Sequence, residues 1–233
     1  MSRSSVVVTS RFRGPPTSGN GGYVAGLLGA QAPGPARVRL HAPPPLDRPL
    51  TIEEDGELRM VDGAATIASS APAAITIEPP PAPSLDVARE ASRGYRGFAR
   101  HPFPTCFVCG PERAEGDGLR IFPGPTDGGM VAAPFVPPAD LVHDGTLERA
   151  IVWAALDCTG YFAIVGDAIV PMLLGEIAAE VRGTVGAGPL VAYGWSLGVE
   201  GRKARCGTAL ASPDGRVLAV ASATWLAPRA AAD

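Results

Sequence analysis

Residues 147–164 read LERAIVWAALDCTGYFAI, the longest stretch of the chain with a helical pattern. Its second half carries one acidic residue, Asp157. Helical spacing places four apolar or aromatic residues on the same face as this acid: Ala150, Trp153, Ala154 and Tyr161. A carboxyl group on such a face loses hydration, which raises its pKa unless hydrogen-bond donors compensate. The stretch therefore predicts a central helix with one buried, chemically informative acid.

Strand patterns surround this helix. Runs at 118–122 and 130–136 precede it, and four β-type runs follow it, at 176–185, 190–200, 203–211 and 216–226. The last two runs meet at Ser212-Pro213-Asp214-Gly215, residues that favour a turn. This half of the chain therefore predicts one helix and a meander of antiparallel strands.

The first half repeats the same order of elements. A β-branched run at 6–13 precedes a short helical pattern at 23–30, and strand runs follow at 36–41, 50–54, 57–61 and 65–77. Asp55-Gly56 between two of these runs is a strong hairpin signal. The same order of a strand, a helix and a meander in both halves indicates a tandem duplication in an α+β protein.

A proline-rich segment at 79–83 separates the two halves. We expect a first unit at 1–83, a linker at 84–104 with a short polar helix at 84–93, and a second unit at 105–233.

The composition, with 46% hydrophobic and 18% charged residues, excludes a disordered chain. A net charge of -3 argues against nucleic-acid partners. The sequence has no apolar run of the roughly 18 residues that cross a membrane and no signal-peptide pattern, so we expect a cytoplasmic protein.

Four motifs, taken in order, resemble the hotdog thioesterases. Asn20-Gly21-Gly22 resembles the His-Gly-Gly that begins the central helix in many members, and Ala154–Asp157 resembles the acid-bearing turn of that helix. Cys106-Phe107-Val108-Cys109-Gly110-Pro111, followed by Gly118-Leu119-Arg120-Ile121, resembles the opening strand region. Residues 201–204 and 213–219 resemble the closing hairpin. The resemblance implies a double hotdog of the acyl-CoA thioesterase type. Each of its two tandem units is a long central helix wrapped by an antiparallel sheet, and together they form an intrachain pseudo-dimer.

The resemblance also implies a composite site, in which Asn20, Gly21 and Gly22 of the first unit face Asp157 of the second. Asp157 acts on the thioester either as general base for water or as nucleophile. Backbone N–H groups at a helix N-terminus suit the oxyanion. The glycines at positions 22, 26 and 29 fall on one helix face, which leaves room for another helix or for a pantetheine arm. We further expect four residues to contact substrate: Tyr23, Trp153, Thr159 and Tyr161.

The expected substrate is an acyl-CoA or acyl-carrier thioester. A non-catalytic acyl-CoA or small hydrophobic ligand binder is the alternative, and a hydratase or dehydratase is less favoured because those enzymes usually need an Asp–His pair. The resemblance leaves open whether two double-hotdog chains form a homodimer. Acyl-chain length and pathway are not indicated.

We expect no metal and no cofactor. Cys106-x-x-Cys109 is followed by no second pair or histidine at a ligand spacing, and Cys158 and Cys206 would have to converge from distant elements. A redox role needs a cysteine pair that opens a helix, whereas Phe107-Val108 between these cysteines predicts a strand.

Overall fold

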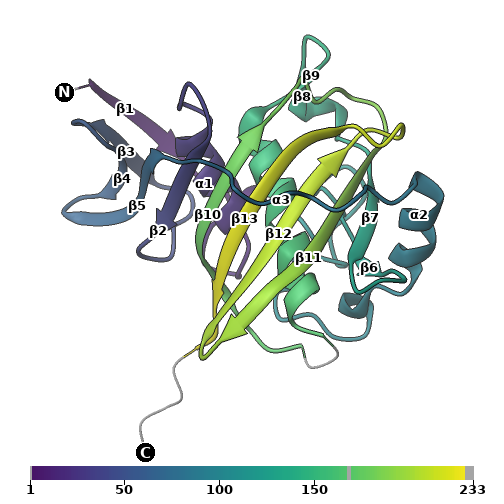
Figure 1. The fold of residues 1–233 in the computed structure, drawn as a ribbon. Coiled ribbons are helices and arrows are strands. Elements are labelled where there is room, and N and C mark those ends of the chain that lie inside the picture. The colour runs from purple at the N-terminus through teal and green to yellow at the C-terminus, as the bar shows by residue number, and fades with distance from the viewer. Residues whose placement is uncertain (1, 167–168, 229–233) are drawn as a thin grey trace, which may run out of the picture.

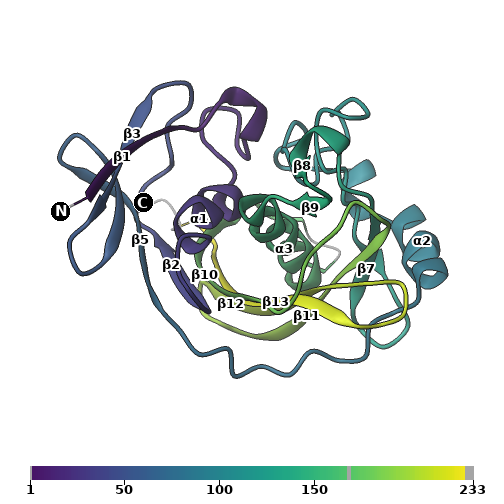
Figure 2. The same ribbon diagram turned by 90° about the horizontal axis from the view of Figure 1, so that it is seen from above.

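The computed structural model describes residues 2–166 and 169–228 (Figure 1). Residue 1 and the last five residues of the predicted second unit, 229–233, lie outside this part. Within it, one antiparallel sheet of eleven strands curves around two central helices, α1 and α3, which lie side by side on its inner face (Figure 2). The described residues contain no helix that is both long and apolar enough to cross a membrane.

The first half of the chain forms one end of the sheet and a short helix. Its elements are β1 (Ser2–Val7), the 3-10 helix η1 (Ser10–Phe12), α1 (Gly21–Gly29), β2 (Ala36–Leu40), β3 (Pro49–Glu54), β4 (Leu58–Asp62) and β5 (Ala65–Pro72). The hairpin predicted at Asp55-Gly56 joins β3 to β4, and Gly56 adopts a φ of 72°, which a glycine accepts without strain.

The second half forms the rest of the sheet and the long helix. Its elements are α2 (Leu85–Arg93), η2 (Arg96–Phe98), β6 (Gly124–Pro125), β7 (Val131–Phe135), η3 (Ala139–Leu141), β8 (Val142–His143), β9 (Thr146–Leu147), α3 (Arg149–Ile164), β10 (Leu173–Val181), β11 (Leu190–Glu200), β12 (Lys203–Ala211) and β13 (Val217–Leu226). The strands β11 and β12 begin and end where the sequence predicts them.

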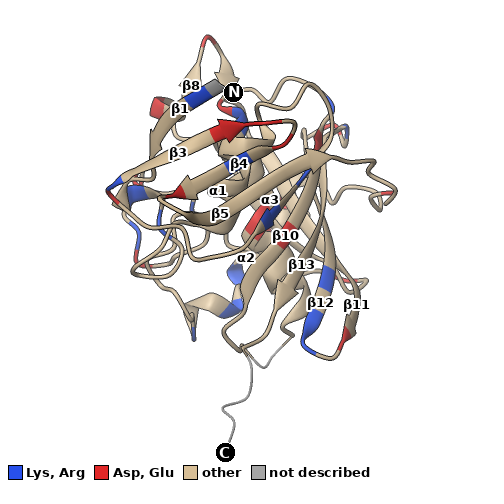
Figure 3. Ribbon diagram, turned by 90° about the vertical axis from the view of Figure 1, so that its left-hand side faces the viewer, with Lys and Arg blue, Asp and Glu red and all other residues tan. Residues whose placement is uncertain are grey.

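The two halves share one continuous sheet, with strand order β1-β3-β4-β5-β2-β10-β13-β12-β11-β7-β6. They join where β2 pairs with β10, with Arg39 opposite Glu176 and Ala36 opposite Ala179. The Glu176 carboxylate lies 3.8 Å from the guanidinium of Arg39. Residues of both charges are spread over the two units (Figure 3). The predicted duplication therefore takes the form of two meanders paired edge to edge.

Glycines allow α1 and α3 to approach closely. A Cβ atom at Gly26 would lie 2.7 Å from both the Cα and the carbonyl oxygen of Ala150, and one at Gly29 would collide with the Trp153 ring. The small face predicted at positions 22, 26 and 29 is thus filled by another helix, one of the two occupants that the sequence left open.

Two strand predictions in the region of 106–122 are wrong. Cys106–Cys109 forms a turn, closed by a 2.9 Å hydrogen bond from the Gly110 N–H to the Cys106 carbonyl. The segment 118–122 pairs with this turn rather than with a strand, and Arg120 interrupts it with a φ of 51°. The run at 6–13 also ends early, because β1 stops at Val7 and η1 follows. The residue types of these segments suit a strand. A tight turn or a residue with positive φ leaves no mark on the alternation of apolar and polar residues, so the sequence pattern does not reveal them.

The expected linker helix is α2, which packs on the second half of the sheet. Its buried Ala88 and Ala91 belong to one hydrophobic cluster with Ala132 on β7 and Val191 on β11. The segment that leads to it from β5 runs along the outer face of the sheet (Figure 2) and is held there by a 3.1 Å hydrogen bond from the Tyr193 hydroxyl to the Pro80 carbonyl. The unit boundaries at 83 and 105 stay a prediction.

Replacing Gly26 tests the helix contact. We expect Gly26→Ala to lower the free energy of unfolding by about 3 kcal/mol, because the new methyl group meets the α3 backbone, which cannot move aside as a side chain can. Gly34→Ala is the control, since a Cβ there meets no atom within 4 Å, and we expect it to change stability by less than about 0.5 kcal/mol. Equal unfolding midpoints in urea for the two variants would contradict this packing.

Candidate active site

Asp157 lies in the middle of the molecule, where the two central helices meet. It belongs to α3, the central helix of the second unit, and is only 1% exposed. Its Oδ2 atom accepts two hydrogen bonds from the first unit, one from the Gly22 N–H at 2.9 Å and one from Asn20 Nδ2 at 3.0 Å. A Cβ atom at Gly22 would overlap the Cβ of Asp157, so this contact requires a glycine.

Asn20 is the N-cap of α1, and this role fixes its orientation. Its Oδ1 accepts the Tyr23 N–H at 2.9 Å, and its own N–H donates to the Phe12 carbonyl at 2.8 Å. With the oxygen of the amide committed to the helix, the NH₂ group faces Asp157. Asn20, which caps the start of α1, therefore also supplies one hydrogen-bond donor to the buried acid.

The surroundings of Asp157 favour its neutral form more than water does. Burial raises its pKa to about 7, while the hydrogen bonds from Gly22 and Asn20 oppose the rise. Its second oxygen, Oδ1, has no hydrogen-bond partner in the part of the chain that the structure describes. The acid therefore has one oxygen anchored to α1 and one buried oxygen without a hydrogen-bond partner among the described residues.

A cavity of about 420 Å³ opens beside this acid. Both units contribute to its wall. Asn20, Gly21 and Asp157 lie in this wall, together with apolar residues such as Met172, Leu174 and Trp225. A mostly apolar wall with a few polar groups is the usual composition of a small-molecule site.

The two glycine amides do not play equal parts. The Gly22 N–H is occupied by Asp157. The Gly21 N–H donates to no atom of residues 2–166 or 169–228, and Gly21 lines the cavity. Gly21 is the first residue of α1, so its N–H is one of the donors that a helix leaves unpaired at its positive end. It is the amide best placed to serve a ligand.

Of the expected site residues, Asn20, Gly21, Asp157 and Tyr161 line the cavity, and Gly22 anchors the acid. The other three lie elsewhere in the core. Tyr23 stacks on Phe12 with ring centroids 4.0 Å apart, Trp153 packs against Gly29, and Thr159 packs against Gly194. These three residues do not line the cavity, so their expected contact with substrate stays a prediction.

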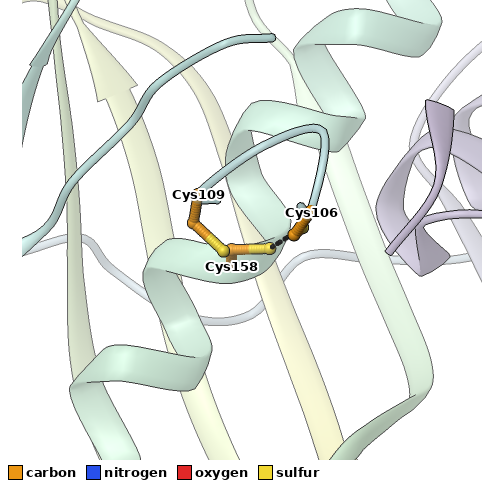
Figure 4. Close-up of side chains that lie close together, drawn as sticks. All are labelled: Cys106, Cys109 and Cys158. Atoms are coloured by element: carbon orange, nitrogen blue, oxygen red, sulfur yellow. Dashed lines mark hydrogen bonds between the residues drawn. The ribbon is translucent and has the colours of Figure 1, made fainter. Parts of the chain in front are cut away.

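A group of buried cysteines also lines the cavity and was not expected from the sequence. The sulfur atoms of Cys106, Cys109 and Cys158 lie within 4.8 Å of one another (Figure 4). His101 joins them, with its Nε2 3.3 Å from Cys109 Sγ. Hydrogen bonds from Cys109 and Cys158 lower the pKa of the Cys106 thiol, whereas burial raises that of Cys109. The Cys106-x-x-Cys109 spacing and the position of Cys158 directly after Asp157 were the available signals, and only the fold brings Cys158 to the turn at 106–109.

The comparisons with known proteins concern the fold. No protein-family model matches the sequence, and no curated protein matches it. Among solved structures, a hot dog-fold protein of unknown function from Alicyclobacillus acidocaldarius is 13% identical, with a TM-score of 0.65 over 98% of this chain and 94% of that one. Acyl-CoA thioesterase II TesB2 from Mycobacterium marinum is 16% identical, with a TM-score of 0.63 over 98% and 94%.

The chain has the double hotdog fold. A third similar structure, the dehydratase domain of a mycocerosic acid synthase-like polyketide synthase, is 14% identical, with a TM-score of 0.65 over 98% of this chain and 91% of that one. In the present double hotdog, the predicted pseudo-dimer is the pair of units joined through β2 and β10, and the acid and the glycines come from opposite units. The fold prediction is confirmed, and proteins of different names share this architecture.

Replacing Asn20 tests how the buried acid is held. We expect Asn20→Asp to lower the free energy of unfolding by about 2–3 kcal/mol, because it keeps an oxygen for the helix cap but removes the donor to a buried carboxyl group. Ser84→Asp is the matched control at the exposed N-cap of α2, where the Ser84 hydroxyl accepts the Val87 N–H, and it should leave stability nearly unchanged. Similar melting curves for the two variants would contradict the contact with Asp157.

Proposed function

We propose that this double hotdog hydrolyses acyl thioesters, with acyl-CoA or an acyl carrier as substrate and Asp157 as general base. One observation carries the proposal: the buried carboxyl group of one unit meets the N-terminus of the central helix of the other at the wall of a largely apolar cavity. The structural similarity to a protein named acyl-CoA thioesterase II supports this choice of substrate class.

The chemistry needs one proton acceptor and one oxyanion donor. Asp157 Oδ1 takes a proton from water while the water oxygen bonds to the thioester carbonyl carbon, and the Gly21 N–H stabilises the negative charge on the carbonyl oxygen. The C–S bond then breaks, and the proton moves from the carboxyl group to the departing thiolate. The products are a carboxylic acid and a free thiol, and no other reactant is consumed.

The packing of Asp157 favours a base over a nucleophile. Its Cβ lies directly against Gly22, and its Oδ2 is held by two donors. Advancing to form an anhydride would separate the carboxyl group from both. A single turnover in ¹⁸O-labelled water tests the two roles. A base always places the label in the acid product, so unlabelled product with the label in Asp157 would identify a nucleophile whose anhydride opens at the Asp157 carbonyl.

Asn20 favours hydrolysis over dehydration. It stands at the helix start where a hydratase or dehydratase usually has its histidine, and a carboxamide does not transfer protons at neutral pH. Among the described residues, no histidine is hydrogen-bonded to Asp157. The similarity to a dehydratase domain is therefore a similarity of fold without the expected acid–base pair.

Replacing Asp157 tests the proposal directly. In an assay of thiol release from a panel of acyl-CoAs, we expect Asp157→Asn to reduce kcat by about 10²–10⁴-fold, because it removes the general base and keeps the shape of the side chain. Asp214→Asn, at an exposed turn residue, is the control and should keep full activity. Binding by calorimetry should change little in either variant. Tight binding without thiol release by the wild type would instead identify a ligand-binding protein.

Replacing Gly21 tests the oxyanion site by removing one backbone N–H group. Proline is well tolerated at the first position of a helix, and Asn20 before it already has the extended ψ of 131° that proline requires. We expect Gly21→Pro, which deletes the N–H, to lower kcat by about 10²–10³-fold. Gly21→Ala introduces the same Cβ but keeps the N–H, so it should retain most of the activity. Equal losses in both variants would assign the effect to the side chain and exclude this amide as the donor.

A further inference from the structure

The cysteine cluster is not used by the proposed hydrolysis. Cys106 and Cys109 come from one turn and Cys158 from α3, and all three are buried on the wall of the cavity (Figure 4). We propose that these three cysteines bind one Zn²⁺ ion through their thiolates, against the expectation from the sequence that the chain needs no metal.

The spacing of the sulfur atoms suits a tetrahedral ion. Zn–S bonds of about 2.3 Å at tetrahedral angles place two sulfur atoms about 3.8 Å apart. Cys106 Sγ and Cys158 Sγ are 3.7 Å apart, and no pair among the three exceeds 4.8 Å. Small rotations of the side chains are enough to bring all three sulfurs onto one ion. Soft thiolate ligands in such an arrangement select zinc over hard cations such as Mg²⁺ or Ca²⁺.

The turn at 106–109 is built to present two sulfurs together. A spacing of two residues between cysteines is typical of one half of a zinc site. Gly110 closes the turn, and a Cβ atom there would lie 2.5 Å from the carbonyl oxygens of both Pro104 and Cys106. The Leu119 and Ile121 N–H groups bond to the carbonyls of Phe107 and Val108, which fixes the turn from its other side.

Each sulfur atom faces N–H donors, as a thiolate needs. The backbone N–H groups of Cys109 and Val108 contribute to lowering the pKa of the Cys106 thiol. Asn20 Nδ2 lies 3.9 Å from Cys106 Sγ and 3.7 Å from Cys158 Sγ. Neutral thiols accept hydrogen bonds weakly, whereas three thiolates on Zn²⁺ carry a net negative charge that such donors offset.

His101 acts as a donor rather than as a fourth ligand. Its Nδ1 accepts the Phe103 N–H at 2.9 Å, so the proton of the neutral ring is on Nε2, which donates to Cys109 Sγ at 3.3 Å. His101 is thus a positioning residue for one thiolate. Three protein ligands leave the fourth position of the ion to a water molecule or to a ligand in the cavity.

Metal analysis of the reduced protein tests the site. We expect the wild type, purified without oxygen, to hold one Zn²⁺ per chain, to lose it to a strong chelator and to regain it on titration. Co²⁺ in its place should give the thiolate charge-transfer absorption of a sulfur-rich tetrahedral site. We expect Cys109→Ala and Cys158→Ala to bind no stoichiometric zinc. His101→Asn should weaken zinc binding by about 10–100-fold, the effect of losing a partner that orients a ligand.

Cys206→Ala is the matched control. Its sulfur is buried like the others but lies against Gly160 on another face of α3, outside the cluster, so this variant should keep its zinc. Circular dichroism of every variant establishes that it is folded. A folded wild type whose three thiols are reduced and bind no zinc would overturn the proposal, and so would a disulfide that forms among them in the presence of excess zinc.

The zinc site and the hydrolysis can fail separately. Asp157→Asn should lose thiol release and keep its zinc, because it changes none of the three sulfur ligands. Zinc binding without activity in the wild type would leave the metal site standing and remove the proposed hydrolysis.

Discussion

The contact between a buried carboxyl group and the start of a helix from the other unit constrains the rest of the molecule. Asp157 is stable in the core only because Gly22 and Asn20 donate to it. For those donors to reach it, α1 and α3 must touch along their backbones, and the glycines of α1 permit this. Two helices this close keep their strands within reach of each other, and β2 pairs with β10 to give one sheet.

The same contact explains why an acid, a helix N-terminus and a group of sulfur atoms meet in the wall of the cavity. The N-terminus of α1 brings an unpaired N–H at Gly21, and α3 brings the acid and, one residue later, a sulfur. The turn at 106–109 completes this wall with two more sulfurs, and Asn20 touches both the carboxyl group and the thiols. The acid, the helix N-terminus and the cysteines therefore form one polar region in the wall of the cavity.

Much of this arrangement could be predicted from local patterns. The apolar face around Asp157 indicated a buried acid, and the residues before 23–30 indicated a helix start. That the two face each other was implied only by the resemblance to hotdog thioesterases. Strand β12 followed from its composition and flanking turns. The convergence of the cysteines could not be predicted, because Cys158 lies 49 residues after Cys109 in the sequence and the turn between Cys106 and Cys109 resembles a strand in its residue types. The unequal roles of Gly21 and Gly22 also depend on three-dimensional contacts, since adjacent glycines have no distinguishing pattern.

The central claim is that a thioester carbonyl binds between the N-terminus of α1 and the free oxygen of Asp157. A crystal structure with an acyl-CoA analogue whose thioester sulfur is moved away from the carbonyl by one methylene group, and which therefore resists hydrolysis, tests it most directly. The account predicts the acyl chain in the apolar part of the cavity, the carbonyl oxygen on the Gly21 N–H and its carbon facing Asp157 Oδ1. A carbonyl group bound away from both, with the cavity still empty, would contradict it.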